Sequence, residues 1–329
     1  MPAPVSRYRR VRIPAWDCLT AAGDATAAWA ACRDGRSALR RVEGLGWCGT
    51  IADVPGAGVD ALALATARAP WRALDMDGAI AIAACASKGD PAALDAALRG
   101  DAASLLRAGP ERPTAVLARA LGLRSYLPAP VAAACSTGLY GVLGCADLVE
   151  SGAARAALAG ASDASLTPLL VAGFAALGVL CGETRPTVFA APTGFAPAEG
   201  AGFVALGGDG PWRLAAGVRV ADARHETQFI DPSTLHAALA ALWEVGPRPD
   251  LIVVHGTGTA AGDAYELAGL DGGPWRDRPR LVCKPVIGHC LGASGAAELA
   301  LALEAPVACL WKLSLGFGGH LAAVVCVRD

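Results

Sequence analysis

Cys135 lies where an apolar, strand-like run over 128–135 meets a segment with apolar residues at helical spacing over 139–152. A cysteine at the start of a helix experiences the positive end of the helix dipole and free backbone N–H groups. Both favour the thiolate, and the same N–H groups can hold an oxyanion. The residues therefore predict either a nucleophile with a lowered thiol pKa or a buried structural cysteine, of which a chain with 11 cysteines has many.

His255 and His289 are two of only five histidines, and both lie in Gly-rich loops at the ends of apolar, strand-like segments. His255 stands in VVHGTGT, where the glycines permit close approach to the backbone and Thr257 and Thr259 supply hydroxyl groups. His289 stands in KPVIGHCLGASG, five residues after Lys284. A lone histidine is usually a core residue bonded to the backbone, but two in such loops indicate a functional pair.

A competing arrangement centres on Cys290. The segment GHCLG has the form of a nucleophile elbow followed by a helix, and His320 lies downstream in the order that such hydrolases need. The only acids between them, Glu298 and Glu304, fall in the helix directly after the elbow, which is the wrong place for a triad acid. An α/β-hydrolase with Cys290 as nucleophile would also leave ACSTG unexplained.

The composition describes a globular protein with a large apolar interior. Of the 329 residues, 54% are hydrophobic and 18% are charged, which excludes a disordered chain. The net charge of −2 argues against a surface for nucleic acid or anionic membranes. The cysteines include no CxxC pair, so free thiols in a reducing cytoplasm are expected rather than a metal site.

No membrane span is expected. The longest apolar run, 168–181, has 14 residues, whereas a spanning helix needs about 20. The run is therefore interpreted as buried core. Residues 1–16 lack the apolar stretch of a signal peptide. The mean hydropathy of +0.41 is high, which indicates a large interior or a subunit interface.

Strand–loop–helix units alternate along the chain, which indicates an α/β fold with buried strands. Helices are expected after Asp24 or Thr26 and over 61–73, 92–106, 139–152, 261–270 and 292–304. Strands are expected over 8–13, 128–135, 156–165, 201–208 and 321–327, and a loop is expected over 44–58. CSTG at Cys135 and HGTG at His255 occupy the same relative place. Such duplication predicts two halves, 1–208 and 209–329, whose equivalent loops share one site.

Six segments, taken in order, resemble the β-ketoacyl synthases of the thiolase superfamily, close to the type that elongates chains on acyl-carrier protein. They are TAAWAACRDGRSAL, ACSTG with ALAGASDA, RPTVFAAPTGFAPAEGAGFVAL, HGTGTAAGDAYE, KPVIGHCLGASGAAE and LSLGFGGH. Any one alone is weak, but six in the family's order are highly specific. The resemblance implies a thiolase-like, duplicated αβαβα layered α/β fold with two pseudo-equivalent halves. The nucleophilic cysteine would lie in 1–208 and the two histidines in 209–329.

The resemblance also implies a decarboxylative Claisen condensation. Cys135 would take an acyl group from a carrier-protein thioester, and His255 and His289 would hold the malonyl thioester, drive decarboxylation and stabilise the enolate. The supporting residues would be Lys284 and Glu298, which order the histidines, the backbone N–H groups of Cys135 and Leu315 as oxyanion hole, and Thr257 and Thr259 on the pantetheine arm. No metal or redox cofactor is implied, because the phosphopantetheine arm of acyl-carrier protein carries the substrate.

Departures from the family pattern leave other functions open. The chain is short for the family, and Leu313 and Leu315 replace the Asn and the gating Phe of the last turn. The alternatives are a partner subunit of the chain-length-factor type and a non-elongating acyltransferase. Cys135, His255 and His289 favour condensation, because partner subunits usually lose the cysteine.

The resemblance further implies a dimer in fatty acid, polyketide or polyene biosynthesis. Synthases of the family pair through a strand beside the nucleophile segment, here 130–135. Shortened loops around 40–75 and 299–315 should leave apolar surface uncovered, which marks an interface. A homodimer, or a heterodimer with a second ketosynthase-like subunit, is therefore expected.

Overall fold

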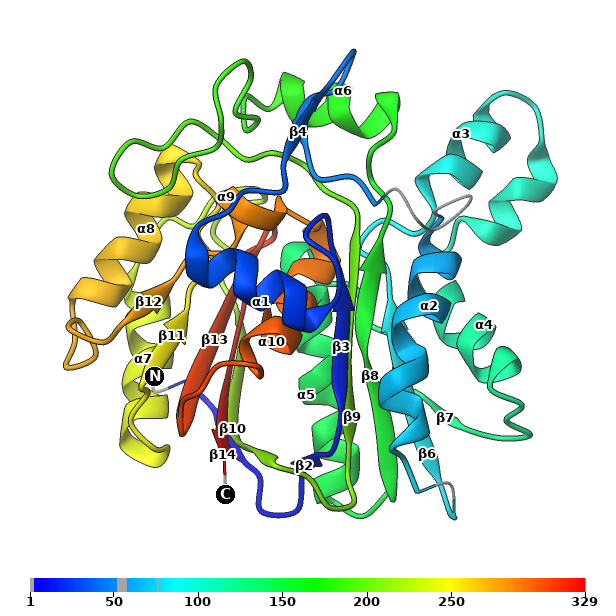
Figure 1. Ribbon diagram of the computed structural model, residues 1–329, viewed down its shortest axis with the longest axis vertical. Helices are drawn as coiled ribbons and strands as arrows, with labels where there is room; N and C mark the ends of the chain where they lie inside the picture. Colours follow the sequence, from blue (N-terminus) through cyan, green and yellow to red (C-terminus); the bar gives the residue numbers. More distant parts are fainter. Residues whose placement is uncertain (1–2, 52–57, 76, 329) are drawn as a thin grey trace.

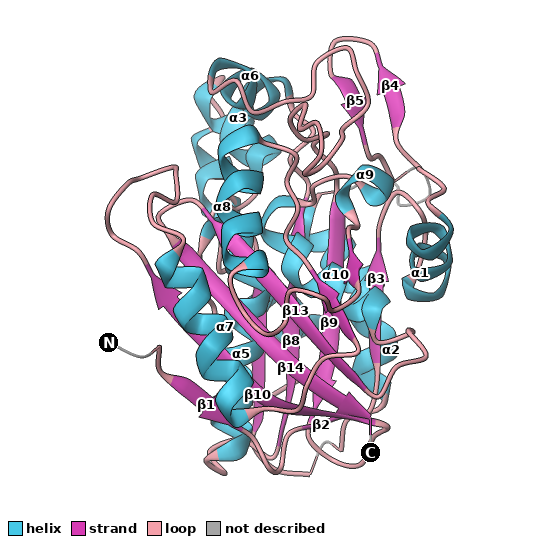
Figure 2. Cartoon of the chain, turned by 90° about the vertical axis from the view of Figure 1, so that its left-hand side faces the viewer, coloured by secondary structure: helices cyan, strands magenta, loops and turns pink. Residues whose placement is uncertain are grey.

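The computed structural model describes residues 3–51, 58–75 and 77–328, which form two large mixed sheets (Figures 1 and 2). The first sheet has the order β3 (Trp16–Leu19), β9 (Gly200–Leu206), β8 (Ala156–Asp163), β6 (Ile80–Cys85) and β7 (Leu127–Pro128). The second has the order β1 (Val5–Arg7), β10 (Trp212–Ala221), β14 (His320–Arg328), β13 (Cys309–Gly316), β11 (Leu251–Val253) and β12 (Arg280–Leu281), with β2 (Arg12–Ile13) also beside β10. β4 (Arg40–Val42) and β5 (Gly46–Cys48) form a separate hairpin.

The two sheets repeat one topology. In the first sheet β3, β9 and β8 are antiparallel neighbours, and β6 and β7 continue parallel to β8. In the second sheet β10, β14 and β13 are antiparallel, and β11 and β12 continue parallel to β13. β1 and β2, from the beginning of the chain, pair with β10 of the second sheet. Residues 1–208 therefore contribute to both sheets, and a division of the chain at 208 stays a prediction.

The repeat pairs different loops from those that the sequence suggested. β6 is the counterpart of β11, so Ser87, just after β6, corresponds to His255. The short 3₁₀ turn that contains Cys135 corresponds to the turn before helix α10, and each turn contains a non-glycine residue of positive φ, Ala134 and Leu291, both at 46°. The expected equivalence of Cys135 and His255 is wrong, because one residue precedes a helix and the other follows a strand.

Helices and sheets alternate in five layers (Figure 1). α5 (Thr137–Glu150) and α10 (Ser294–Ala302) lie between the two sheets. α2 (Val59–Arg72) and α4 (Arg112–Ala120) cover the outer face of the first sheet, and α7 (Ser233–Val245), which packs on α8 (Ala260–Asp271), covers the outer face of the second. The observed order is thus αβαβα, as expected from the resemblance.

Small residues allow the two central helices to fit between the sheets. Every residue of α10 is buried. A Cβ on Gly138 of α5 would lie only 2.8 Å from the backbone nitrogen of Ala296 in α10, so the helices meet where a side chain is absent. The loops that precede α5 and α10 carry Cys135 and His289, and both loops lie at the same end of the central helical layer.

The expected N-terminal helices are present. α1 (Ala25–Asp34) begins after Asp24, whose carboxylate accepts a hydrogen bond from the N–H of Ala27 at 2.9 Å. Asp24 is therefore the cap, and Thr26 is not. The helix expected over 61–73 is α2.

Other segments are shorter than expected. The helix expected over 92–106 is divided into α3 (Pro91–Leu98) and a 3₁₀ segment, Ala102–Arg107, because Gly100 between them has a φ of 109°. The strand expected over 8–13 is reduced to β2, just after β1. The loop expected over 44–58 contains β5, and its residues 52–57 lie outside the described residues.

Residues 128–135 do not form the expected strand, because only β7 pairs with β6. Ala129 donates its N–H to the carbonyl of Ile82 at 2.8 Å. Successive residues of a strand direct their N–H groups to opposite sides, so Pro128 and Pro130 occupy positions that face the free edge of the sheet. Proline has no N–H, and this edge therefore offers no backbone donor at either position.

The apolar run 168–181 is not buried core. In α6 (Pro168–Ala176) only Val171 and Phe174 are buried, whereas Leu169 and Leu177 are 43% and 53% exposed. One face of the helix borders a cavity through Phe174, whereas the opposite face is exposed to solvent although its residues are apolar. None of the helices in the described ranges is both long and apolar enough to cross a membrane.

Most of the large exposed apolar side chains lie on α3, on the 3₁₀ segment after it and on or beside α6, not where the shortened loops suggested. The large exposed apolar side chains are Leu98, Leu105, Leu106, Leu169, Leu177 and Ile230. None of the described residues in 40–75 and 299–315 belongs to this set, so the expected location is wrong. The segment 299–315 is largely covered because α10 and β13 (Cys309–Gly316) pack into the interior.

Candidate active site

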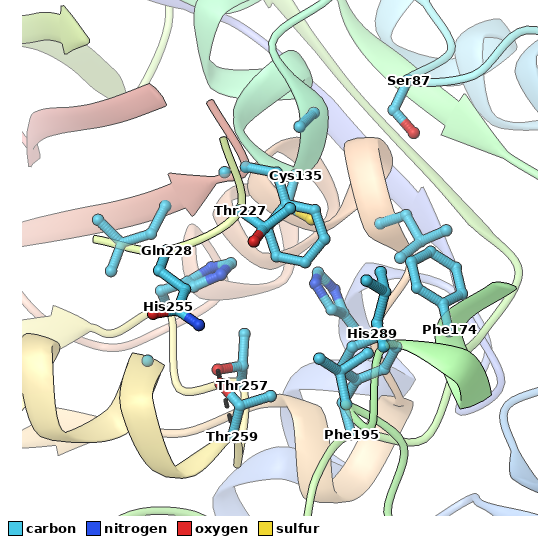
Figure 3. A pocket seen from close by; sticks show the side chains of 18 of the residues that line it. Ser87, Cys135, Phe174, Phe195, Thr227, Gln228, His255, Thr257, Thr259 and His289 are labelled. Carbon is cyan, nitrogen blue, oxygen red and sulfur yellow. Dashed lines mark hydrogen bonds between the residues drawn. The ribbon is translucent and has the colours of Figure 1, made fainter. Parts of the chain in front are cut away.

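A cavity of about 330 Å³ lies where loops from both halves meet. Cys135, His255 and His289 line it together with Thr257 and Thr259 (Figure 3). The structure thus brings together residues from three segments that are distant in sequence. Much of the remaining lining is aromatic or aliphatic, so the site is a largely apolar pocket with a few polar groups.

Cys135 sits in the 3₁₀ turn Ala134–Ser136, immediately before α5. Among the 11 cysteines it alone is partly exposed, and the other ten are buried. Burial raises the pKa of the Cys135 thiol, while the positive charges of Lys88 and Lys284 act in the opposite direction with smaller effect. The expected lowered pKa is therefore wrong, because the cost of desolvating a thiolate exceeds the gain from these charges.

The turn that holds Cys135 abuts β13. Ser314 Oγ donates to the carbonyl of Cys135 at 3.1 Å. Leu315 lines the cavity, and its neighbour Gly316 lies so close that a Cβ there would be 2.7 Å from the carbonyl oxygen of Ala133. The backbones of the two segments are thus in direct contact, although an oxyanion hole formed by Cys135 and Leu315 N–H groups stays a prediction.

Gly316→Ala is expected to lower the free energy of unfolding by about 1–3 kcal/mol, because the nucleophile turn must move to admit the methyl group. Gly173→Ala is the matched control. Gly173 lies in α6 with nothing within 4 Å of a Cβ, and alanine there should be neutral or stabilising by roughly 0.5–1 kcal/mol. Urea unfolding of both variants measures the difference. Equal effects in the two variants would contradict the close approach.

His255 is held through its backbone. Its N–H and that of Gly256 donate to the two carboxylate oxygens of Glu266 at 2.6 and 2.7 Å. The ammonium of Lys284 donates to the carbonyl of His255 and lies 3.4 Å from Nδ1 of the ring. An ammonium group has only donors, so Nδ1 must accept and the ring proton is on Nε2.

His289 lies beside His255, with the ring centroids 5.6 Å apart and the rings nearly perpendicular at 81°. Its Nδ1 is 2.8 Å from Ser294 Oγ, and Phe195 packs against its ring at 4.9 Å. Burial, and then the charge of Lys284, lowers the pKa of both histidines well below the usual value. Both imidazoles are therefore neutral at neutral pH, and each can donate one N–H to a developing oxyanion.

Behind the histidines, Glu298 lies between two buried lysines. Its Oε1 is 2.8 Å from Nζ of Lys284, and its Oε2 is 2.6 Å from Nζ of Lys312. Lys312 also donates to the carbonyls of Val254 and Leu313. None of these three charged side chains lines the cavity, so they position the histidines rather than contact a ligand. Burial lowers the pKa of Lys312, and Glu298 opposes this effect.

The loop after His255 is shaped by Asp263 of α8. Its carboxylate accepts the N–H of Gly258 at 2.9 Å and that of Phe189 at 2.6 Å. The hydroxyls of Thr257 and Thr259 are 3.0 Å apart at the cavity wall. The loop therefore presents two adjacent hydroxyls on a backbone that a buried carboxylate fixes.

Cys290 lies outside the cavity lining and is completely buried. Its thiol donates to the carbonyl of Glu199 at 3.3 Å, and burial raises its pKa. His320, the other residue of that arrangement, is also outside the lining and packs on Tyr140. The hydrolase hypothesis is wrong, because the proposed nucleophile has no access to a substrate.

Three residues at or near the site, Lys312, Asp163 and Lys88, were not predicted from the sequence to have a role there. Lys312 is the one charged residue of the apolar segment CLWKLSLG. Such a segment is a strand that is either buried or at the edge of a sheet, and this was the signal that could have identified Lys312. Asp163 ends β8 and accepts from Ser87 Oγ at 2.6 Å and from the N–H of Gly292 at 3.1 Å. It therefore ties the loop after β6 to the turn before α10. Nothing in the local pattern around Lys88 indicated a place in the cavity.

Two family profiles match this chain, one after the other. The profile described as "Beta-ketoacyl synthase, N-terminal domain" matches residues 63–208, and "Beta-ketoacyl synthase, C-terminal domain" matches residues 217–305. The 3-oxoacyl-[acyl-carrier-protein] synthase 2 of Vibrio harveyi is 28% identical over 193 residues, which cover 51% of this chain and 46% of that protein. The actinorhodin polyketide putative beta-ketoacyl synthase 1 of Streptomyces coelicolor is 31% identical over 201 residues, with 53% and 43% covered. The chain spans about half the length of the curated relatives it matches.

Solved structures share the fold. A type II polyketide synthase acyl-carrier protein in complex with its ketosynthase contains a chain that superposes with a TM-score of 0.88 at 22% identity, covering 98% of this chain and 100% of that one. The complex of the ketosynthase ApeO with its chain length factor ApeC from Xenorhabdus doucetiae contains one with a TM-score of 0.85 at 20% identity, covering 98% of each. At this identity the likeness establishes the thiolase-like fold. Because both domain profiles match in order and together span well over half of the residues, the chain belongs to the β-ketoacyl synthase family.

Proposed function

We propose that this chain is a β-ketoacyl synthase, an acyltransferase that condenses an acyl thioester with malonyl-acyl-carrier protein and releases CO₂. One observation carries the proposal: the only partly exposed cysteine, Cys135, lines the same cavity as two buried, neutral imidazoles, His255 and His289. A nucleophile and two oxyanion donors in one apolar pocket suit an acyl transfer followed by a carbanion attack.

In the first half-reaction the sulfur of Cys135 attacks the carbonyl of an acyl thioester, and the thiol of the carrier's pantetheine arm leaves. Splitting the condensation into two acyl transfers lowers the barrier of each. Thr257 and Thr259 support this step from the other side of the cavity, where their hydroxyls would bond the amide groups of the arm.

In the second half-reaction malonyl thioester loses CO₂ and leaves an enolate. The Nε2–H of His255 would stabilise the enolate oxygen, since its Nδ1 faces the ammonium of Lys284. The Nε2–H of His289 would join it in the tautomer in which the hydroxyl of Ser294 donates to Nδ1. The carbanion then attacks the acyl carbon on Cys135, the cysteine sulfur leaves, and a β-ketoacyl thioester forms on the carrier.

Two related functions remain to be separated by experiment. A partner subunit of the chain-length-factor type would need no nucleophile, and a non-elongating acyltransferase would need no enolate site. The combination of an accessible Cys135 with the buried histidine pair supports condensation over both. Incubation with acyl- and malonyl-acyl-carrier protein, followed by mass spectrometry of enzyme and product, tests this. A β-ketoacyl product is expected, whereas acyl transfer without elongation, or no acyl-enzyme at all, would overturn it.

The proposed partners are acyl-carrier protein and a second ketosynthase-like subunit or a second copy. The exposed leucines on α3, on the 3₁₀ segment after it and on or beside α6 offer apolar surface for such a subunit. Pro128 and Pro130 remove backbone donors from the free edge of the first sheet, so contact at that edge would depend on side chains rather than on a continuous sheet.

Lys312→Met is expected to move the acidic limb of the condensation rate to higher pH, on the order of one pH unit. The charge of Lys312 is one cause of the lowered pKa of His255 and His289. Without it both pKa values rise toward the usual one, and protonation of His255 would set an Nδ1–H against the ammonium of Lys284. The pH profile is measured together with the thermal midpoint, which reports any loss of folding. An acidic limb that does not move would contradict the electrostatic role.

A further inference from the structure

Lys88 is the one lysine among the described residues that line the cavity, and its ammonium lies beside the ring of Phe174. It follows β6 by three residues, in the loop that corresponds to the His255 loop of the other half. Leu177 and Val179 also line the cavity. A long cationic side chain there requires an explanation, because an ammonium group is costly to place beside aromatic and aliphatic groups unless it has partners.

Among the described residues, the ammonium of Lys88 has one hydrogen bond and one contact with an aromatic ring. Nζ donates to Ser87 Oγ at 3.1 Å and lies 5.4 Å from the ring centroid of Phe174. Ser87 in turn donates to Asp163 at 2.6 Å, and that carboxylate also accepts from Ser165 and from the N–H of Gly292. No carboxylate of the described residues forms an ion pair with Lys88, so donor capacity is left for a ligand.

The position of Lys88 indicates which part of a ligand it meets. In the view of Figure 3, Ser87 lies on the opposite side of Cys135 from Thr257 and Thr259. If the threonines face the pantetheine arm, the loop of Lys88 faces the acyl group. Lys88 and Cys135 line the same cavity, and the positive charge of Lys88 acts to lower the pKa of the Cys135 thiol.

We infer that Lys88 selects acyl groups that carry an oxygen acceptor, a carboxylate or a ketone, along the chain that enters the apolar part of the pocket. This rests on the proposed function, because it names the substrate class of the same site. An unfunctionalised alkyl chain would leave the ammonium without a partner, whereas a carboxylate or ketone oxygen would complete its hydrogen bonds. The shared chemistry is a hydrogen bond from Nζ to a substrate oxygen.

Three acyl groups of equal shape test the inference. One chain ends in an isopropyl group, the second in a methyl ketone and the third in a carboxylate, each prepared at several lengths as a thioester. The rate of acylation of Cys135 is followed by mass spectrometry for the native chain, for Lys88→Met and for Lys88→Arg. Only the ratio between acyl groups is interpreted, because a changed thiol pKa affects all three equally.

The native chain is expected to prefer an oxygen-bearing group over the isopropyl chain by roughly ten- to a hundredfold, the range for a hydrogen bond to a charged group. Lys88→Met should abolish or invert this preference, and Lys88→Arg should retain it. A preference for the carboxylate alone identifies an ionic partner, and equal rates for ketone and carboxylate identify a neutral acceptor. The same ratios in the native chain and in Lys88→Met would overturn the inference while leaving the synthase function intact. If no thioester acylates Cys135, the proposed function itself fails, and this inference fails with it.

Discussion

Cys135→Ala is expected to abolish acyl-enzyme formation and to lower the condensation rate by at least about 10⁴-fold, the scale of losing a catalytic nucleophile. The reason is access, since ten of the 11 thiols are buried and only Cys135 opens on the cavity. Incubation with an acyl thioester should add one acyl mass to the peptide that contains ACSTG.

Cys290→Ala is the matched control. This thiol is completely buried and lies outside the cavity lining, so its loss should leave acylation within about threefold of the native rate. Acyl mass on the peptide of Cys290, or acylation that persists in Cys135→Ala, would remove Cys135 from the mechanism.

The pH dependence of acylation provides a second readout. Burial raises the pKa of the Cys135 thiol, so most molecules carry the protonated thiol at neutral pH. The thiolate fraction, and with it the acylation rate, should rise about tenfold per pH unit below that pKa. A rate that is already constant at neutral pH would show instead that the thiolate is stabilised beyond what Lys88 and Lys284 supply.

His255→Ala and His289→Ala are expected to leave acylation of Cys135 largely intact and to lower condensation by roughly 10²–10⁴-fold each, the effect of losing one proton-transfer or oxyanion group. The two rings lie 5.6 Å apart and would contact the same developing charge. The double variant should therefore lose less than the product of the single losses. Single-turnover formation of the acyl-enzyme and of the β-ketoacyl product separates the two steps.

His236→Ala serves as control, because His236 lies on α7 in an outer layer and packs on Trp275 away from the cavity. It should change neither step appreciably. Acylation that falls as steeply as condensation in either active-site variant would place that histidine in the first half-reaction. Product formation that is unchanged in both would exclude the pair from catalysis.

The local sequence was sufficient for the loops that carry reactive groups. Glycines and small residues after apolar segments indicated strand ends and helix starts, and Cys135, His255 and His289 each lie in such a loop. The start of α1 near Asp24 also followed from short-range chemistry, because a side-chain oxygen can satisfy the free N–H groups of a first turn. The helix α2 followed from the helical spacing of its apolar residues. These features depend on residues only a few positions apart.

The pattern of apolar residues predicted the wrong structure for two segments. The apolar run 128–135 forms no strand after β7, and its last residues enter the 3₁₀ turn that contains Cys135. The run 168–181 is equally apolar, yet much of it is exposed, because a single helix can border a cavity with one face and solvent with the other. Hydropathy measures the composition of a segment and does not indicate which of its faces is covered.

By itself, the sequence determined an α/β class from its alternating units, and through its resemblance to the β-ketoacyl synthases it indicated the αβαβα order and the three loops that carry a thiol and two imidazoles. Only the tertiary structure decided the chemistry of those groups. The protonation of Cys135, His255 and His289 depends on burial and on charges from other segments, among them Lys312 and Lys88. Desolvation and Coulomb interactions act through space, so their balance depends on which segments pack together and not on the residues that neighbour a group along the chain.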